Sequence, residues 1–129
     1  MATMDVVTLF PTNLKGTLSI PTSKSLTHRA LICAALSKGK STITNVVMSE
    51  DIKATIHALE QIGAKFTKDK NAIIVRGIKN IKVPSQPIDC NESGSTLRFL
   101  IPLLTLTGKP VEFTGKKSLL ARPQHVYKK

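Results

Sequence analysis

The chain has 129 residues, which suits one domain of ordinary size or a piece of a larger one. Apolar residues make up 41% of the chain and aromatic residues only 4%, so aliphatic side chains must form most of the core. The net charge of +11 fits a nucleic-acid surface, a site for small anions, or a fragment separated from an acidic counterpart. Because the lysines are scattered and tyrosine occurs once, nucleic acid is the weaker interpretation.

Targeting and metal signals are missing from the sequence. No apolar stretch approaches the roughly 20 residues that a membrane-spanning helix needs, and the first ten residues lack the pattern of a signal peptide. Cys33 and Cys90 stand apart without metal-ligand spacing, which is typical of a reduced cytoplasmic protein. We therefore expect a cytoplasmic protein with no membrane partner and no metal site.

The predicted elements begin with a short β-like run at 17–20. Ser23 is expected to cap a helix over 24–37, and the apolar run at 30–36 leaves no polar face, which predicts a buried helix. Gly39 ends this helix, and the β-branched residues at 41–47 predict a strand.

A second, amphipathic helix is predicted between Ser49 and Gly63. Ser49 caps it, and Glu50 and Asp51 occupy its first turn, where the helix dipole favours acids. The remaining predicted elements are a hairpin at 64–68 and 72–76, strands at 87–90 and 111–114, a third helix at about 96–107, and a basic irregular segment at 115–129. Pro102 should kink the third helix or leave one of its carbonyls unpaired.

The first and third helices match when they are aligned without gaps at an offset of 69 residues. Six of the 14 positions from 27 to 40 are then identical: Thr27, Arg29, Leu31, Ile32, Gly39 and Lys40 meet Thr96, Arg98, Leu100, Ile101, Gly108 and Lys109. This repeat predicts an α/β (α+β) fold of β-α-β-α-β-β units with helices packed on sheets. Unit one covers about 17–77 and unit two about 86–129. Because unit two stops before its last strands, we expect a partial N-terminal lobe.

The segment 23–29, SKSLTHR, gathers polar groups at the start of the first helix. A helix N-terminus offers free N–H groups and a positive dipole end, which attract anions. Lys24, Ser25 and Arg29 add an ammonium, a hydroxyl and a guanidinium, and the last two share a face because they are four residues apart. The pattern favours a phosphate or carboxylate, with a capped helix and a solvated basic turn as the alternative.

Two later segments have similar chemistry. The run 91–98, NESGSTLR, places Gly94 where backbone can approach a ligand and Arg98 one turn into the next helix. Arg122 precedes a proline, which favours an extended and stiffly presented arginine. A plain Gly/Ser loop and a surface arginine are the alternatives. Since no paired carboxylates and no nucleotide-binding glycine motif occur, the chain predicts anion clamps and no general acid or base.

These motifs resemble those of the EPSP (5-enolpyruvylshikimate-3-phosphate) synthase family. Residues 21–31, PTSKSLTHRAL, are similar to its N-terminal signature, 92–100 to its glycine loop before an arginine-bearing helix, and 120–123 to its Arg-Pro element. The three segments occur in family order with family spacing. The resemblance covers almost the whole chain but only about the first third of such an enzyme.

The resemblance implies two lobes, each of three such units, that close over the substrates. It implies a transferase of the shikimate pathway, which leads to chorismate and the aromatic amino acids. In that reaction the 5-hydroxyl of shikimate-3-phosphate attacks phosphoenolpyruvate, and phosphate leaves without any metal or organic cofactor. The family's acid/base carboxylates lie in the part outside these 129 residues. We therefore expect no turnover by this chain until the remainder of the enzyme completes it.

The resemblance also assigns substrate-binding roles. Lys24 is expected to contact both substrates, and Ser25 and Arg29 to bind shikimate-3-phosphate. The backbone at Gly94 and the guanidinium of Arg122 are expected to bind phosphoenolpyruvate. All of these roles position polyanions by electrostatics, which gives a use for the excess positive charge.

Other positions of the glycine loop carry finer expectations. Arg98 and Ser95 are expected to support the site from behind the residues that touch substrate. Gly94 resembles the glycine of glyphosate-sensitive enzymes, since a larger residue there would crowd that inhibitor. Two residues depart from the family pattern: Glu92 stands where an amide is usual, and Phe99 stands where a proline is usual.

Three other functions are weighed against this one. A UDP-N-acetylglucosamine enolpyruvyl transferase typically carries a cysteine before its Arg-Pro element, and residues 115–121 contain none. A basic nucleic-acid-binding module would bind with an affinity that falls steeply as the salt concentration rises. The sequence lacks the aromatic residues that stack on bases. A folded but inactive scaffold fragment is compatible with the family.

Overall fold

The computed structural model describes residues 6–127. Residues 1–5, which begin the segment examined for a signal peptide, and residues 128–129, which end unit two, lie outside the described part. The elements in chain order are α1 (Lys24–Leu36), β1 (Lys40–Thr44), α2 (Glu50–Gln61), β2 (Lys65–Asp69), β3 (Ala72–Arg76), β4 (Ile88–Asp89), α3 (Gly94–Thr105), β5 (Phe113–Thr114), α4 (Lys117–Leu120) and a 3-10 turn at His125–Tyr127.

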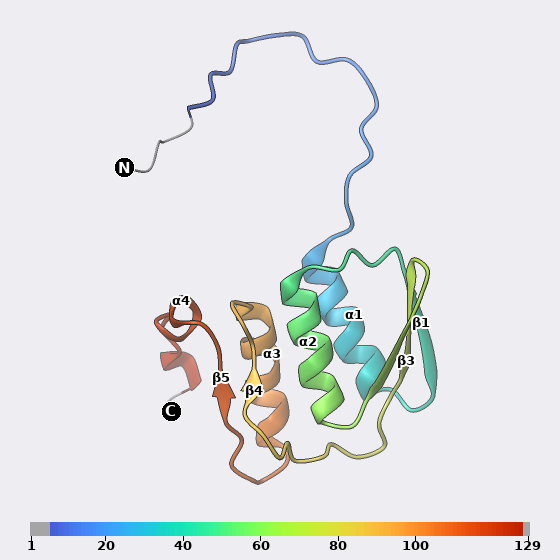
Figure 1. The fold of residues 1–129 in the computed structure, drawn as a ribbon, viewed down its shortest axis with the longest axis vertical. Coiled ribbons are helices and arrows are strands. Elements are labelled where there is room, and N and C mark those ends of the chain that lie inside the picture. Colours follow the sequence, from blue (N-terminus) through green and yellow to red (C-terminus); the bar gives the residue numbers. More distant parts are fainter. Residues whose placement is uncertain (1–5, 128–129) are drawn as a thin grey trace.

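The three long helices lie side by side and pack on one another (Figure 1). An antiparallel sheet in the order β1-β3-β2 lies against α1 and α2, while β4 pairs in parallel with β5 close to α3 (Figure 1). The core between these layers is aliphatic, with Leu31, Ile52, Leu59 and Leu100 fully buried. The predicted α/β class, with helices packed on sheets, is confirmed.

Three serines start the three long helices. The side-chain oxygens of Ser23, Ser49 and Ser93 each accept a hydrogen bond from the backbone N–H three residues further on. The caps at Ser23 and Ser49 were predicted, whereas α3 begins before its predicted start because Ser93 caps it from within the predicted loop. All three helices begin at the same end of the molecule, so three positive dipole ends gather there (Figure 1).

The strand predicted at 17–20 is wrong. These residues are extended but unpaired, and they belong to an arm that leads away from the body of the molecule (Figure 1). Leu18 and Ile20 are each at least 80% exposed. A strand requires a hydrogen-bonded neighbour, and no other segment of residues 6–127 lies beside this arm.

The prediction that the first helix is buried on all sides is also wrong. Leu31 and Ala35 are fully buried, but Ile32 is half-buried and Cys33 is exposed. The uncovered side of α1 borders an open apolar hollow of about 460 Å³, whose other wall is α3 around Pro102. Within the described chain, the sheet and α2 cover only the opposite side of α1.

Unit two follows the predicted β-α-β-α order through β4, α3, β5 and α4. The short helix α4 lies within 115–129, which was expected to be irregular, and the unit boundaries themselves stay a prediction. None of the helices among residues 6–127 is long and apolar enough to cross a bilayer.

Candidate anion-binding site

A cavity of about 420 Å³ lies at the end of the molecule where the three helices begin. It is lined by Lys24, Asp51, Glu92, Gly94, Ser95, Arg98, Phe99 and Arg122. Five residues that the sequence singled out therefore face one space, although they come from three separate segments. The cavity is polar and open, which suits a charged ligand of small size.

Lys24 is held by a carboxylate that the sequence had assigned only to helix capping. The Lys24 Nζ atom lies 2.6 Å from Asp51 Oδ2, and the Asp51 side chain is the more buried of the two, at 27% exposed against 58%. Asp51 thus orients the ammonium toward the cavity at the start of α1. No sequence signal marks this pair, because α1 and α2 meet only in the folded chain.

Arg122 reaches the cavity from the segment after α4. The Lys116 N–H donates to Asn91 O at 2.8 Å, which fixes the start of α4 beside the loop before α3. A β-carbon on Gly94 would lie 3.0 Å from Arg122 Nη1. The missing side chain of Gly94 therefore gives the guanidinium room beside the first turn of α3.

Pro102 explains how the C-terminal segment is tied to α3. It has no N–H, so the carbonyl of Arg98, four residues earlier, loses its helical donor. The hydroxyl of Tyr127 donates to that carbonyl at 3.1 Å. The predicted unpaired carbonyl is thus present and finds a partner outside the helix, and the segment carrying Arg122 is anchored on both sides.

Glu92 brings a negative charge to the cavity wall. Its Oε2 atom lies 3.7 Å from Lys116 Nζ, and its Oε1 accepts from the Ser118 hydroxyl at 3.2 Å. These contacts turn the carboxylate toward α4 and partly neutralise it. Glu92, which stands where the family usually has an amide side chain, is therefore stabilised by its contacts with Lys116 and Ser118.

Ser25 and Arg29 are paired with each other as predicted but do not line the same cavity. Arg29 Nη1 donates to both the hydroxyl and the carbonyl oxygen of Ser25, the latter at 3.2 Å. The Arg29 guanidinium lies 5.1 Å from the centre of the Phe99 ring, whose side chain lines the cavity. Ser25 and Arg29 thus form a second polar group on α1, next to the cavity and separated from it by Phe99.

The charges of the cavity leave two guanidiniums uncompensated. Asp51 pairs with Lys24 and Glu92 with Lys116, whereas no carboxylate of residues 6–127 forms an ion pair with Arg98 or Arg122. Guanidiniums bind carboxylates and phosphates through two parallel N–H groups. The arrangement can therefore hold a dianion, and it offers no free carboxylate to act as general acid or base.

Two buried side chains, those of His28 and Cys90, have shifted pKa values. His28 is fully buried, and burial lowers its pKa, a change that the nearby Asp51 charge opposes and that Lys24 and Arg29 reinforce. Burial, with a smaller contribution from Asp89, raises the pKa of Cys90 to about 12. Both side chains are therefore uncharged at neutral pH and face the core.

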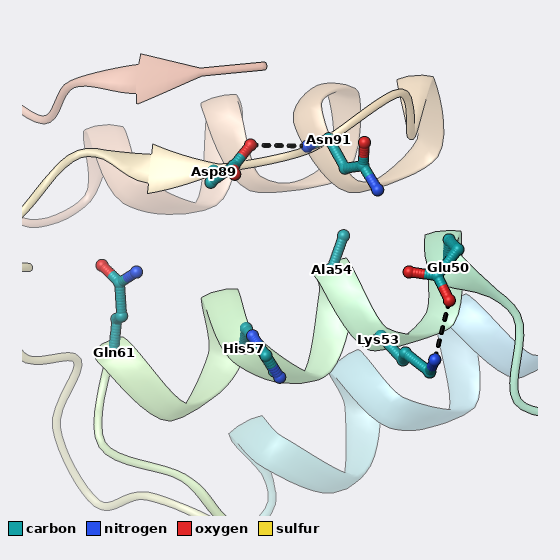
Figure 2. Close-up of a pocket in the computed structure, with 7 residues that line it drawn as sticks. All are labelled: Glu50, Lys53, Ala54, His57, Gln61, Asp89 and Asn91. Carbon is teal, nitrogen blue, oxygen red and sulfur yellow. Dashed lines mark hydrogen bonds and ion pairs between the residues drawn. The ribbon is translucent and has the colours of Figure 1, made fainter. Parts of the chain in front are cut away.

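A separate hollow of about 220 Å³ lies between α2 and β4 (Figure 2). Its polar groups are mostly engaged locally: Lys53 pairs with Glu50 at 2.7 Å, and Asp89 accepts from the Asn91 N–H at 2.8 Å (Figure 2). His57 is exposed on α2, as predicted. Within residues 6–127, no three His, Cys, Asp or Glu side chains gather closely enough to hold a metal ion.

The chain is similar to known proteins of one family over almost its whole length. The family model of EPSP synthase (3-phosphoshikimate 1-carboxyvinyltransferase) matches residues 10–127. The chain belongs to the EPSP synthase family. Two curated relatives, both named 3-phosphoshikimate 1-carboxyvinyltransferase, come from Clostridium kluyveri (49% identical over 124 residues) and Clostridium perfringens (46% over 125 residues).

These relatives are much longer than the chain. The matches cover 96% of the chain but 29% and 30% of the two relatives. A solved structure, EPSP synthase from Acinetobacter baumannii, matches 85% of the chain and 26% of its own length with a TM-score of 0.73 and 26% identity. The chain therefore spans less than a third of the proteins it resembles, and its fold agrees with part of the solved enzyme.

Proposed function

We propose that this chain supplies part of the substrate site of an enzyme that transfers the enolpyruvyl group of phosphoenolpyruvate to the 5-hydroxyl of shikimate-3-phosphate. The observation that carries the proposal is the meeting of Lys24, Gly94 and Arg122 at one cavity. These are the three residues that the family resemblance assigns to phosphoenolpyruvate. The names of the relatives support the same reaction.

In this proposal the α3 side of the site holds phosphoenolpyruvate. Arg122 binds its phosphate or carboxylate through two N–H groups, and the backbone at Gly94 contributes N–H groups at the start of a helix. Arg98 adds positive charge to the cavity wall, and Ser95 supports the turn. Lys24, the first residue of α1, is oriented by Asp51 and reaches both substrates.

The α1 side holds shikimate-3-phosphate through Ser25 and Arg29. Their present pairing leaves the Arg29 guanidinium partly engaged with the Ser25 hydroxyl and carbonyl. A phosphate would take the hydroxyl and guanidinium as donors together, because both groups lie on one face of the helix.

The chemistry follows from bringing two anions together. The 5-hydroxyl oxygen gives up its proton and forms a bond to C2 of phosphoenolpyruvate, while C3 gains a proton. The phosphate then leaves with the electron pair of the C2–O bond, and C3 gives up a proton to restore the double bond. The cationic residues of this chain offset the repulsion between the two substrates and the charge on the departing phosphate. Proton transfer is assigned to carboxylates of the longer protein, which we place in the cytoplasm.

The test is phosphate release by the longer protein that contains this chain. We expect phosphate to appear when phosphoenolpyruvate and shikimate-3-phosphate are supplied together, and not with either alone. The matched comparison replaces shikimate-3-phosphate by UDP-N-acetylglucosamine. Phosphate release with UDP-N-acetylglucosamine but not with shikimate-3-phosphate would instead assign the chain to a UDP-N-acetylglucosamine enolpyruvyl transferase.

A further inference from the structure

Four buried polar side chains form a continuous line across the three long helices. His28 Nδ1 lies 2.8 Å from Thr55 Oγ1, which lies 2.7 Å from Thr96 Oγ1, which in turn donates to Ser93 Oγ at 2.7 Å. The exposed fractions of these residues are 0% for the first three and 1% for Ser93. We call this line of His28, Thr55, Thr96 and Ser93 the polar relay.

The direction of the hydrogen bonds in the polar relay can be worked out from Ser93. Ser93 Oγ caps α3 by accepting from the Thr96 N–H at 3.1 Å, and it also accepts the Thr96 hydroxyl proton. Since Thr96 has one hydroxyl proton, its oxygen must accept from Thr55, and the Thr55 oxygen must accept from His28. His28 therefore carries a proton on Nδ1. Since burial lowers the pKa of His28, the ring is neutral, and its Nε2 is an acceptor without a partner among residues 6–127.

Packing alone does not require this line of polar groups. Valine has nearly the shape of threonine, and apolar residues would fill the same space between the helices without needing buried partners. The hydroxyl groups therefore form directional hydrogen bonds that fix the relative position of the helices, whereas apolar side chains would allow the helices to shift. The His28–Thr55 bond fixes α1 against α2, and the Thr55–Thr96 bond fixes α2 against α3.

Both ends of the polar relay lie next to the candidate site. Ser93 directly precedes Gly94, and His28 directly precedes Arg29. The middle of the relay also meets the site, because Thr96 Oγ1 lies 3.5 Å from the carbonyl oxygen of Asp51, whose carboxylate holds Lys24. The relay therefore connects the three helix starts that carry the cationic and backbone groups.

We propose that His28, Thr55 and Thr96 are positioning residues that set the spacing between the α1 side of the site and the first turn of α3. This proposal rests on the proposed function and deepens it. None of the three touches a substrate; they act through Arg29, Lys24 and the backbone at Gly94. Losing one hydroxyl would leave two buried groups unpaired and let α3 shift against α1.

The kinetic test uses the longer enzyme with isosteric variants at α2 and α3. Thr55→Val and Thr96→Val each remove one hydroxyl, while Thr55→Ser and Thr96→Ser keep it. We expect each valine variant to raise KM for both substrates about 10-fold, by the loss of aligned charge-assisted contacts, and the serine variants to restore KM to within about twofold. The double valine variant should be little worse than either single one, since both interrupt the same line.

A matched control separates positioning from stability. Ile62→Val removes a buried methyl group at the end of α2, far from the polar relay, and should leave KM unchanged. The proposal is overturned if Thr55→Val lowers only the folded fraction with KM unchanged, or if Ile62→Val raises KM as much. An inactive wild-type enzyme would instead overturn the proposed function, and the positioning role with it.

A second measurement needs no variant and no activity. Nitrogen-15 NMR of the wild-type imidazole rings distinguishes a protonated from an unprotonated ring nitrogen. The polar relay requires His28 to carry its proton on Nδ1, with Nε2 bare, at neutral pH. The opposite tautomer, or a rapidly exchanging mixture of the two tautomers, would contradict the relay.

Discussion

Arg122 Nη1 lies 3.0 Å from the point that a β-carbon on Gly94 would occupy, although 28 residues separate the two in sequence. Gly94→Ala would push only the far end of a flexible side chain, so the fold should tolerate it. The guanidinium would leave its place beside the first turn of α3. We expect KM for phosphoenolpyruvate in the longer enzyme to rise about 10-fold or more, which equals the loss of one charge-assisted contact.

The same substitution tests the inhibitor hypothesis. If glyphosate occupies the space beside Gly94, its inhibition constant should rise more than KM, because the added methyl group crowds the inhibitor directly. Steady-state inhibition of the wild type and Gly94→Ala gives both the inhibition constant of glyphosate and the KM for phosphoenolpyruvate. Thermal unfolding of the two proteins checks that their stability is the same. Equal KM values in the two proteins would show that Arg122 does not bind phosphoenolpyruvate from this position. Undiminished wild-type activity at high glyphosate would sink the inhibitor hypothesis.

His28 should make the fold sensitive to acid. Its pKa in the folded chain is lowered from the ordinary value of 6.5, chiefly by burial, with Lys24 and Arg29 adding to the effect and Asp51 opposing it. The unfolded chain therefore binds the proton more readily. The stability due to neutral His28 is complete above pH 6.5 and is lost as the pH falls through the folded pKa.

Urea unfolding at pH 7.5 and pH 5.5 measures the first part of this loss, which is at most about 1.4 kcal/mol over the one pH unit between 6.5 and 5.5. His28→Gln should lose less stability on acidification than the wild type. An NMR titration of the His28 ring gives the folded pKa directly. A midpoint at or above 6.5 would refute the prediction.

Gly77 is the position where a side chain should be least tolerated. A β-carbon there would lie 1.7 Å from the Ser37 carbonyl oxygen and 2.6 Å from that of Ala34, and both belong to backbone that cannot turn aside. Gly77→Ala should therefore destabilise the fold by about 3 kcal/mol.

Gly39→Ala is the comparison for Gly77→Ala. Its β-carbon meets nothing within 4 Å, and the cost comes only from the positive φ of 107°. A loss of about 1 to 2 kcal/mol is expected there. Denaturant unfolding of both variants gives the two values, and a Gly77→Ala protein as stable as Gly39→Ala would show that β3 does not pass so close to α1.

The two cysteines should differ sharply in reactivity. Cys33 is exposed on α1, whereas Cys90 is buried with its pKa raised to about 12, so its thiolate is scarce and shielded. In the 129-residue chain at pH 8, an alkylating reagent should modify Cys33 and spare Cys90. Mass spectrometry after a short pulse shows which site reacts, and urea should make both reactive. Equal labelling without urea would contradict the burial of Cys90.

Local signals in the sequence were sufficient for most of the helices. The caps at Ser23 and Ser49 and the stop at Gly39 depend on neighbours along the chain, so α1 and α2 could be placed within a residue or two. The strand predicted at 17–20 failed because a strand depends on a partner that the local sequence does not name. The buried helix predicted at 24–37 failed on one side for a similar reason, since burial depends on what packs against it.

The sequence predicted which residues form the site, but not how their side chains are arranged. Family motifs pointed to Lys24, Gly94 and Arg122, and these three now face one cavity. The Lys24–Asp51 pair and the hydroxyl of Tyr127 on the Arg98 carbonyl could not be read from spacing, because each joins segments that meet only through the packing of the helices. Ser25 and Arg29 were expected to bind the other substrate, shikimate-3-phosphate, and they lie beside this cavity.

The central claim is that the start of α1 recognises a phosphate. Calorimetric binding of shikimate-3-phosphate and of shikimate to the longer enzyme tests it most directly, with Arg29→Ala measured beside the wild type. We expect the wild type to prefer the phosphorylated ligand by about 100-fold and Arg29→Ala to lose at least tenfold of that preference, with its affinity for shikimate unchanged. An Arg29→Ala enzyme that keeps the full preference would contradict the assignment of this helix start as the phosphate site.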